Sequence, residues 1–271
     1  MPEITLAVVG GGTMAQAILR GALGAGALSA DAVLVAEPDH ATRDRLGQWG
    51  VATVERASAF AGRLTGATRI LLAVKPQMLS VAGADLAGAA DGRGVISILA
   101  GSTIARLGAA VGAGARIVRT MPNLPARIGK GVTALAPAPD ATLDDRAFAR
   151  TLFECVGEVI DLDEPLMDAF TAIAGSGPAY VFYLAEALRD AGAQLGLEPA
   201  DTLRIVRATI AGAGALLAQS ADDPADLRAA VTSKKGTTDA AITALENAGV
   251  RAAFERAAVA ARDRGAELAA L

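Results

Sequence analysis

Over residues 1–162, short apolar, β-branched runs alternate with stretches of helical periodicity, and this alternation is what most limits the folds open to the chain. Strands separated by helices indicate right-handed crossovers, so the pattern predicts a largely parallel sheet covered by helices. The predicted strands are Ile4–Val9, Ala32–Ala36, Arg69–Val74, Gly94–Leu99, Arg116–Arg119, Val132–Ala136 and Val156–Leu162.

After residue 162 the pattern changes, because no strand-like run recurs and apolar residues take a helical spacing. Leu203, Val206 and Ile210, for example, fall on one face of a helix. We therefore predict an α/β domain over residues 1–162 and an all-helical domain over residues 163–271.

Charge and composition exclude several classes of protein. The formal net charge of −4 argues against a general nucleic-acid binder. No apolar run reaches the roughly 18 residues that a membrane span needs. Cys155 is the only cysteine, so no intrachain disulfide can form, and we expect a cytoplasmic protein. No His, Cys, Asp and Glu residues have metal-ligand spacing, so we expect no metal.

The first predicted strand runs into Gly10-Gly-Gly-Thr-Met-Ala15, a GxGxxA pattern. Gly10 suits a tight turn, and Gly12 allows a close approach of the backbone to a ligand. The helix that follows, with Thr13 and Met14 in its first turn, directs free N–H groups and its positive dipole end towards a pyrophosphate. The pattern predicts a dinucleotide site.

Glu37 ends the second predicted strand, where an acidic side chain commonly accepts hydrogen bonds from the ribose hydroxyls of the cofactor. The carboxylate disfavours a 2′-phosphate and therefore favours NADH over NADPH. Arg43 or Arg45 is close enough in sequence to meet such a phosphate, so NADPH stays open. The simpler interpretation of Glu37 is an ordinary surface acid.

Loops at the carboxyl ends of later strands are further places for a cofactor. One follows the strand at 69–74, and the next lies in Ser97–Thr103. Their candidate cofactor-binding residues are Ala73, Val74, Lys75, Pro76 and Ala100. The turn that carries Asn123 is stiffened by Pro122 and Pro125, and the residues alone indicate only a rigid turn there.

The segment Val231–Asp239 (VTSKKGTTD) combines two lysines with hydroxyl side chains in front of a predicted helix. It lacks the GxxxxGK[ST] order of a nucleotide-hydrolysing loop and lies between two helices. A helix that begins at Thr237 or Thr238 has free N–H groups for an anion. The simpler interpretation is a helix start capped by Thr237, with both lysines in solvent.

Taken together, these motifs resemble those of the Δ1-pyrroline-5-carboxylate reductases. The resemblance covers essentially the whole chain and rests on GGGTMAQAI from Gly10, AVKPQ from Ala73, TMPN from Thr120, GSGPAY from Gly175, VTS from Val231 and GTT from Gly236. The last three are the most diagnostic.

The resemblance implies a Rossmann domain followed by a helical dimerisation domain. It implies hydride transfer from NADH or NADPH to the C=N carbon of 1-pyrroline-5-carboxylate, which gives L-proline. It also implies a homodimer through the helical domain, and assemblies of such dimers, up to decamers, occur in the family.

The resemblance further implies a cofactor contact at Asn123 and a substrate site. Its residues are Ser176, Ser233, Gly236, Thr237 and Thr238, with the Thr238 hydroxyl as the catalytic hydrogen-bond donor to the imine nitrogen. Close helix packing is an equal explanation for the glycines around Ser176.

The chain departs from the family at Lys234 and Lys235, where a proline and a glycine are usual, and at Leu124, which replaces a threonine. The lysine pair keeps a second hypothesis open, a related imine or hydroxyacid reductase. However, residues 178–194 lack the lysine that hydroxyacid enzymes of this plan place there. A third hypothesis is a dinucleotide-binding regulatory protein without turnover.

Overall fold

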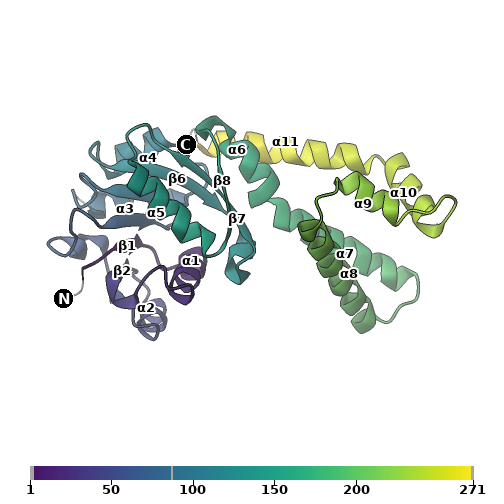
Figure 1. The fold of residues 1–271 in the computed structure, drawn as a ribbon, viewed down its shortest axis with the longest axis horizontal. Helices are drawn as coiled ribbons and strands as arrows, with labels where there is room; N and C mark the ends of the chain where they lie inside the picture. Colours follow the sequence, from purple (N-terminus) through teal and green to yellow (C-terminus); the bar gives the residue numbers. More distant parts are fainter. Residues whose placement is uncertain (1–2, 87, 270–271) are drawn as a thin grey trace. The chain divides into compact units, whose positions relative to one another are not determined.

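The structure is a computed structural model that describes residues 3–86 and 88–269. The chain forms two compact units. Of the described residues, those up to 176 together with 261–269 form the first unit, and residues 177–260 form the second. Figure 1 labels the helices and strands of both units.

The first unit is built on one sheet, whose strand order is β3-β2-β1-β4-β5-β6-β7-β8 within the described residues. Every neighbouring pair is parallel except β6 and β7. The strands are β1 (Leu6–Val9), β2 (Val33–Ala36), β3 (Ala52–Val54), β4 (Arg69–Leu72), β5 (Gly94–Ser97), β6 (Arg116–Pro122), β7 (Gly131–Pro137) and β8 (Gly157–Asp161). The largely parallel sheet is therefore confirmed.

β3 is a strand that the sequence patterns miss. It is three residues long, lies at one edge of the sheet beside β2, and is only half-buried. A run this short has too few residues to show the apolar periodicity of a buried strand.

Helices connect the strands and cover both faces of the sheet (Figure 1). They are α1 (Thr13–Gly24), α2 (His40–Gly47), α3 (Leu79–Leu86), α4 (Ile104–Val111), α5 (Leu143–Glu154) and α6 (Met167–Phe170). Short 3-10 turns lie at Ala30–Ala32, Ala57–Phe60, Pro76–Met78, Leu124–Ile128 and Glu164–Leu166, and a π-helix at Thr171–Gly175.

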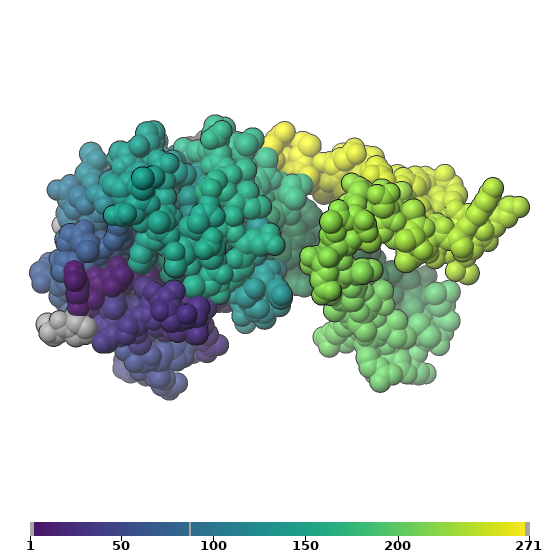
Figure 2. Space-filling model, in the orientation of Figure 1, coloured from purple at the N-terminus to yellow at the C-terminus, as the bar shows by residue number. Residues whose placement is uncertain are grey.

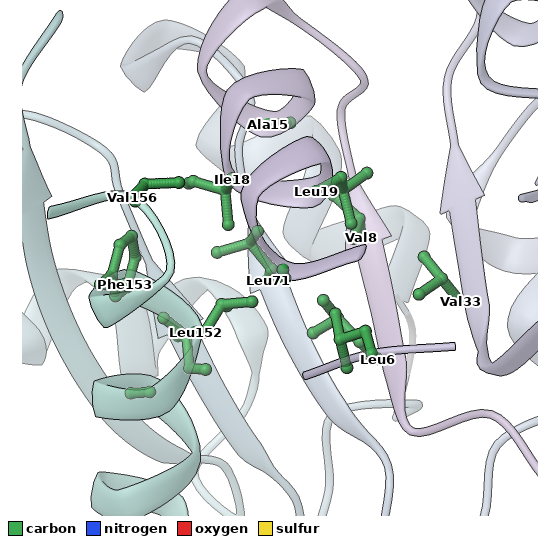
Figure 3. Close-up of a cluster of buried hydrophobic side chains, with 14 of the residues drawn as sticks. Leu6, Val8, Ala15, Ile18, Leu19, Val33, Leu71, Leu152, Phe153 and Val156 are labelled. Carbon is green, nitrogen blue, oxygen red and sulfur yellow. The ribbon is translucent and has the colours of Figure 1, made fainter. Parts of the chain in front are cut away.

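Two apolar cores lie on opposite faces of the sheet, because alternate residues of a strand point to opposite sides. Leu6 and Val8 of β1 belong to the core under α1 and α5, whereas Ala7 and Val9 belong to the core under α3 and α4. Figure 3 shows the first core, where Ile18, Leu19, Leu71 and Phe153 meet with no exposed surface. Each such buried side chain contributes roughly 1.5–3 kcal/mol.

The second unit is helical: among the described residues no strand follows β8, as predicted. Its helices are α7 (Gly177–Gln194), α8 (Pro199–Gln219), α9 (Pro224–Ala230) and α10 (Thr237–Asn247), followed by α11 (Val250–Ala269). α7 and α8 approach closely where buried Gly192 lies against Thr202, and any larger side chain at 192 would overlap that threonine. None of the described helices is both long and apolar enough to span a membrane.

The end of α11 packs within the first unit. Arg106 of α4 donates to the carbonyl of Leu268 at 3.2 Å, and Gly265 lies beside Asp168 of α6. Asp168 is in turn 3.6 Å from the guanidinium of Arg119, a buried residue of β6 that also pairs with Glu164 at 3.1 Å.

Asp145 is a buried carboxylate that ties α5 to the sheet. Its oxygens accept hydrogen bonds from Arg116 at 2.6 Å, from Arg69 at 3.2 Å and from the backbone and hydroxyl of Thr142, the N-cap of α5. Gly94 lies directly against it, where a Cβ would overlap the carboxylate. Burial opposes ionisation, but the hydrogen bonds from Arg116 and Thr142 outweigh it and hold the pKa of Asp145 below its ordinary value.

We expect Asp145→Asn to lower the free energy of unfolding by about 3 kcal/mol at pH 7, because two arginines lose a buried partner. A carboxyl with a lowered folded-state pKa stabilises above its unfolded pKa of about 3.9, and this stabilisation is lost as the pH falls through the folded-state pKa. The difference in the free energy of unfolding between the unmodified protein and Asp145→Asn, measured by urea unfolding, should therefore become smaller below about pH 4. Asp144→Asn, at an exposed position of the same helix, is the control. An equal loss in that variant would contradict this account.

Candidate active site

The turn after β1 has a conformation that only glycine accepts readily. Gly10 has a φ of +98°, and a Cβ there would lie 2.8 Å from the carbonyl oxygen of Ala73. Its N–H donates to the carbonyl of Ala36 at 2.8 Å. The turn therefore brings the carboxyl ends of β1, β2 and β4 together at one edge of the sheet.

The amino terminus of α1 lies at this edge with no side-chain cap. Its N-cap is Gly12, no acidic residue lies in its first turn, and a Cβ on Gly12 would meet nothing within 4 Å. Thr13 is exposed and Met14 half-buried. Farther along the helix, Ile18 and Leu19 are fixed in the first core (Figure 3), so the open helix end is held rigidly. Such an end favours an anion, and the space at Gly12 allows one to come close.

Glu37 lies against the glycine turn. Its Oε2 accepts from the N–H of Gly11 at 2.7 Å, and its Oε1 accepts from the N–H of Asp39 at 2.9 Å. Arg43 donates to the carbonyls of Glu37 and Pro38, at 2.8 and 2.6 Å. The carboxylate is thus fixed beside the turn, and the guanidinium of Arg43 binds backbone oxygens.

Arg45, the second arginine weighed as a phosphate partner, lies on the exposed side of α2. Its closest hydrogen-bond acceptor is Oε1 of Gln16, at 3.4 Å, and Gln16 itself donates to the carbonyl of Gly11 at 2.6 Å. Among the described residues, Glu37 is therefore the charged side chain that hydrogen-bonds to the backbone of the glycine turn.

The loops after β4 and β5 lie at the same edge. Ala73 and Val74 contact the glycine turn, Lys75 is exposed, and Pro76 opens a 3-10 turn. Ala100 is half-buried in the loop after β5.

Ser102, in that same loop, is a residue that the sequence patterns did not single out. It is fully buried, and its Oγ has no hydrogen-bond partner among the described residues. Its only sequence signal is its place in the segment Ser97–Thr103.

Asn123 follows β6 and has both ends of its amide engaged. Oδ1 accepts from the N–H of Val132 at 3.0 Å, and Nδ2 donates to the carbonyl of Ala174 at 3.0 Å. The residue is 8% exposed. Ser176, half-buried, follows the π-helix that contains Ala174.

The remaining candidates lie in the second unit, on the turn between α9 and α10. The helix start at Thr237 is confirmed, but the N-cap is Gly236, with no side-chain cap, so a Thr237 cap is wrong. Ser233 and Gly236 form a tight turn in which Gly236 N–H donates to the Ser233 carbonyl at 2.9 Å. Thr237 and Ser233 are exposed, and Thr238 is half-buried. Figure 2 shows α9 and α10 at the surface of their unit.

Lys235 is the one described non-glycine residue with positive φ, at 61°. Its backbone N–H donates to Oδ2 of Asp239 at 2.9 Å, which fixes the turn. The side chains of Lys234 and Lys235 are exposed. The turn thus keeps a backbone conformation suited to glycine although its sequence has a lysine there.

Among the described residues, no group of three or more His, Cys, Asp and Glu side chains could hold a metal ion. His40 pairs with Asp44 at 2.9 Å on the surface of α2. Burial and the nearby Glu154 raise the pKa of the Cys155 thiol, which disfavours the reactive thiolate.

We expect Lys235→Gly to raise the free energy of unfolding by about 1 kcal/mol, because the left-handed conformation costs a residue with a Cβ roughly that much. Lys234→Gly is the matched control and should give no gain. Thermal unfolding of both variants measures this, and a destabilised Lys235→Gly variant would show that the turn does not hold this conformation.

Comparison with known proteins agrees with this geometry. The family described as pyrroline-5-carboxylate reductase dimerisation matches residues 164–268, and the family described as NADP oxidoreductase coenzyme F420-dependent matches residues 5–101. A pyrroline-5-carboxylate reductase from Synechocystis is 39% identical over 98% of this chain and 98% of its own.

Solved structures of pyrroline carboxylate reductases are also similar to this chain over nearly its full length. A pyrroline-5-carboxylate reductase from Coxiella burnetii has a TM-score of 0.90 at 31% identity, covering 98% of this chain and 99% of its own. The Plasmodium falciparum pyrroline carboxylate reductase, solved with NADP bound, has a TM-score of 0.86 at 25% identity over 99% of both chains. With a Rossmann-type sheet, an open helix end after its first strand and relatives matched over nearly their full length, this chain belongs to the pyrroline-5-carboxylate reductase family.

Proposed function

We propose that the protein reduces 1-pyrroline-5-carboxylate to L-proline with NADH or NADPH. The observation that carries this proposal is the uncapped amino terminus of α1 behind the Gly10 turn, in a chain that belongs to this reductase family. The third hypothesis, a binding protein without turnover, and the second, a reductase for another substrate, have no comparable support.

The residues present fit a dinucleotide. The amides at Gly12, Thr13 and Met14 would hold the pyrophosphate, because nothing in the chain caps them and the space beside Gly12 is open. Glu37 would accept hydrogen bonds from the ribose hydroxyls. The other proposed cofactor contacts, at the same edge of the sheet, are Gly10, Ala73, Val74, Lys75, Pro76, Ala100 and the backbone of Asn123, whose side-chain amide is already engaged at both ends.

The start of α10 is the proposed substrate site. The amides of Thr237 and Thr238 are at a helix start without a side-chain cap, which suits the substrate carboxylate. The Gly236 N–H donates to the Ser233 carbonyl, so Gly236 would contribute to the proposed site by letting the carboxylate approach the backbone. Ser233 flanks this turn. Ser176, which belongs to the first unit, is a separate proposed substrate contact.

The cofactor, when bound, supplies the hydride that reduces the C=N carbon. The chain must orient the imine and make its carbon more electrophilic. We assign this to the Thr238 hydroxyl, which would donate a hydrogen bond to the imine nitrogen. A hydroxyl has a pKa far above neutral, so its role is to polarise the bond, while water delivers the proton that the amine product gains.

We further propose a cytoplasmic homodimer that forms through the helical unit. The single cysteine fits a reducing compartment. The helical unit exposes many large apolar side chains, and a large exposed apolar surface on a protein is typical of an interface with another chain. They include Phe182, Tyr183, Leu184, Leu188, Leu216, Leu217, Leu245 and Phe254. Size-exclusion chromatography with light scattering would tell a dimer from a decamer.

The direct test is to follow the oxidation of NADH and of NADPH at 340 nm with 1-pyrroline-5-carboxylate and to identify the product as proline. No turnover with either cofactor would overturn the proposal.

Gly12→Ala separates cofactor binding from folding. In the free protein the new methyl group meets no atom within 4 Å, so the free energy of unfolding should change by less than about 1 kcal/mol. The methyl group would, however, lie where the pyrophosphate approaches, and we expect at least a tenfold weaker dinucleotide affinity by fluorescence titration. Gly24→Ala, at the other end of α1 and equally open, is the control. Undiminished affinity in Gly12→Ala would place the cofactor elsewhere.

Thr238→Val removes the hydroxyl and preserves the shape, and we expect kcat to fall about 100-fold with NADH affinity unchanged. Thr238→Ser retains the hydroxyl and should keep most of the activity. Equal rates in the two variants would remove the hydroxyl from the mechanism.

Glu37→Gln tests the preference for NADH. The amide oxygen can still accept a hydrogen bond from Gly11, but the negative charge is gone. We expect the ratio of kcat/KM for NADPH to that for NADH to rise about tenfold, since about 1.4 kcal/mol of repulsion is removed. Glu55→Gln, beyond β3, should leave the ratio as it is. Glu37→Ser, which removes both charge and acceptor, should shift the ratio in the same direction, and a constant ratio in all three would exclude Glu37 as the selector.

A further inference from the structure

The turn that precedes Ser176 has an irregular backbone. Thr171–Gly175 is a π-helix, and the N–H of Ser176 donates to the carbonyl of Thr171, five residues earlier, at 2.8 Å. Short π-helical turns occur mostly inside α-helices and frequently at functional sites. Here the turn ends at the residue that we assign to the substrate.

The sequence creates a hydrogen-bonding deficit in this turn. In an α-helix the carbonyl of Ala174 accepts from the N–H four residues later, but that residue is Pro178, which has no N–H. The proline ring also crowds the carbonyl of the residue four places before it. Ala174 is half-buried, and a carbonyl that water reaches poorly is costly to leave unpaired, so a donor from another part of the chain stabilises it.

Asn123 supplies that donor. Its Nδ2 lies 3.0 Å from the carbonyl oxygen of Ala174, and its own amide is fixed because Oδ1 accepts from Val132 N–H at 3.0 Å. Val132 belongs to β7, so the donor is held by the sheet. A second contact supports the turn: a Cβ on Gly175 would lie 3.0 Å from Cε of Met121 in β6.

Asparagine suits both partners at once. One side must accept from a backbone N–H while the other donates to a backbone carbonyl, and among short side chains the carboxamide does both. An aspartate of the same shape could still accept from Val132, but as a carboxylate it would oppose the Ala174 carbonyl with a second acceptor.

We propose that Asn123 is a positioning residue for the reaction: its amide locks the π turn that Pro178 leaves short of a donor, and thereby sets the position of Ser176. The inference rests on the proposed function for the role of Ser176. It differs from direct cofactor binding by Asn123, because the effect on turnover passes through Ser176.

The first test does not need activity. Asn123→Asp should lower the thermal midpoint by about 4 °C, as expected for the loss of one buried hydrogen bond. Pro178→Ala gives residue 178 an N–H, so in that background Asn123→Asp should cost less than half as much. Asn247→Asp, at the only other asparagine and exposed on α10, should change the midpoint little. Equal losses in both backgrounds would overturn the lock.

The second test uses turnover with 1-pyrroline-5-carboxylate. Asn123→Asp should lower kcat/KM for the imine about tenfold and leave the dissociation constant of NADH unchanged. In a Ser176→Ala background the same substitution should cost less than twofold, because the residue through which it acts is gone. An equal loss in both backgrounds, or a matching rise in the NADH dissociation constant, would overturn the positioning role.

The two tests separate the inference from the proposed function. If the unmodified protein does not turn over the imine, the proposed function fails, and the thermal measurements still decide whether Asn123 locks the turn. If Asn123→Asp fails to fold, the Pro178→Ala background decides: recovery of folding there supports the lock, and failure there overturns it.

Discussion

The close approach of two backbones, at Gly10 and Ala73, sets the geometry on which the site depends. A Cβ at residue 10 would lie only 2.8 Å from the Ala73 carbonyl oxygen, so the two backbones can come this close only because residue 10 is glycine. This close approach lets the chain turn at the end of β1 and begin α1 at the edge of the sheet. The buried face of α1 then fixes its amino terminus, and Glu37 accepts from the backbone of the same turn. A local steric requirement thus places an open helix end and a carboxylate side by side.

Sequence patterns were sufficient for the architecture because burial on both faces leaves continuous apolar runs in β1, β2, β4 and β5. They missed β3, whose residues are half-buried, and they did not show that β6 and β7 pair antiparallel, since pairing direction leaves no trace in a single run. The helical second part was evident, but not the return of the last turns of α11 to the first unit.

At the site, the glycine turn and Glu37 could be predicted because their geometry is local to one βαβ unit. The contacts of Asn123 could not be. Its partners are 9 and 51 residues away in sequence, so the turn that holds it looked merely rigid. The Gly236 cap was missed for another reason: threonine is the better side-chain cap in general, and only the backbone of this turn places glycine there. At Lys235 the backbone keeps a left-handed conformation, with a φ of 61°, although a residue with a Cβ does not favour it.

The chain leaves the first unit after residue 176 and returns to it at residue 261, so the helical unit is an insertion within the first. An insertion whose two ends are anchored behaves, when unfolded, as a closed loop with fewer conformations than a free tail. The entropy of closing such a loop rises only with the logarithm of its length. Once the sheet has folded and docked Gly265 and Leu268, the closure part of this entropy, about 4 kcal/mol for a loop of this length, has already been lost, while ordering each helical residue still costs about 1–2 kcal/mol. Folding of the nucleotide-binding part should therefore promote folding of the helices, even though they share no sheet.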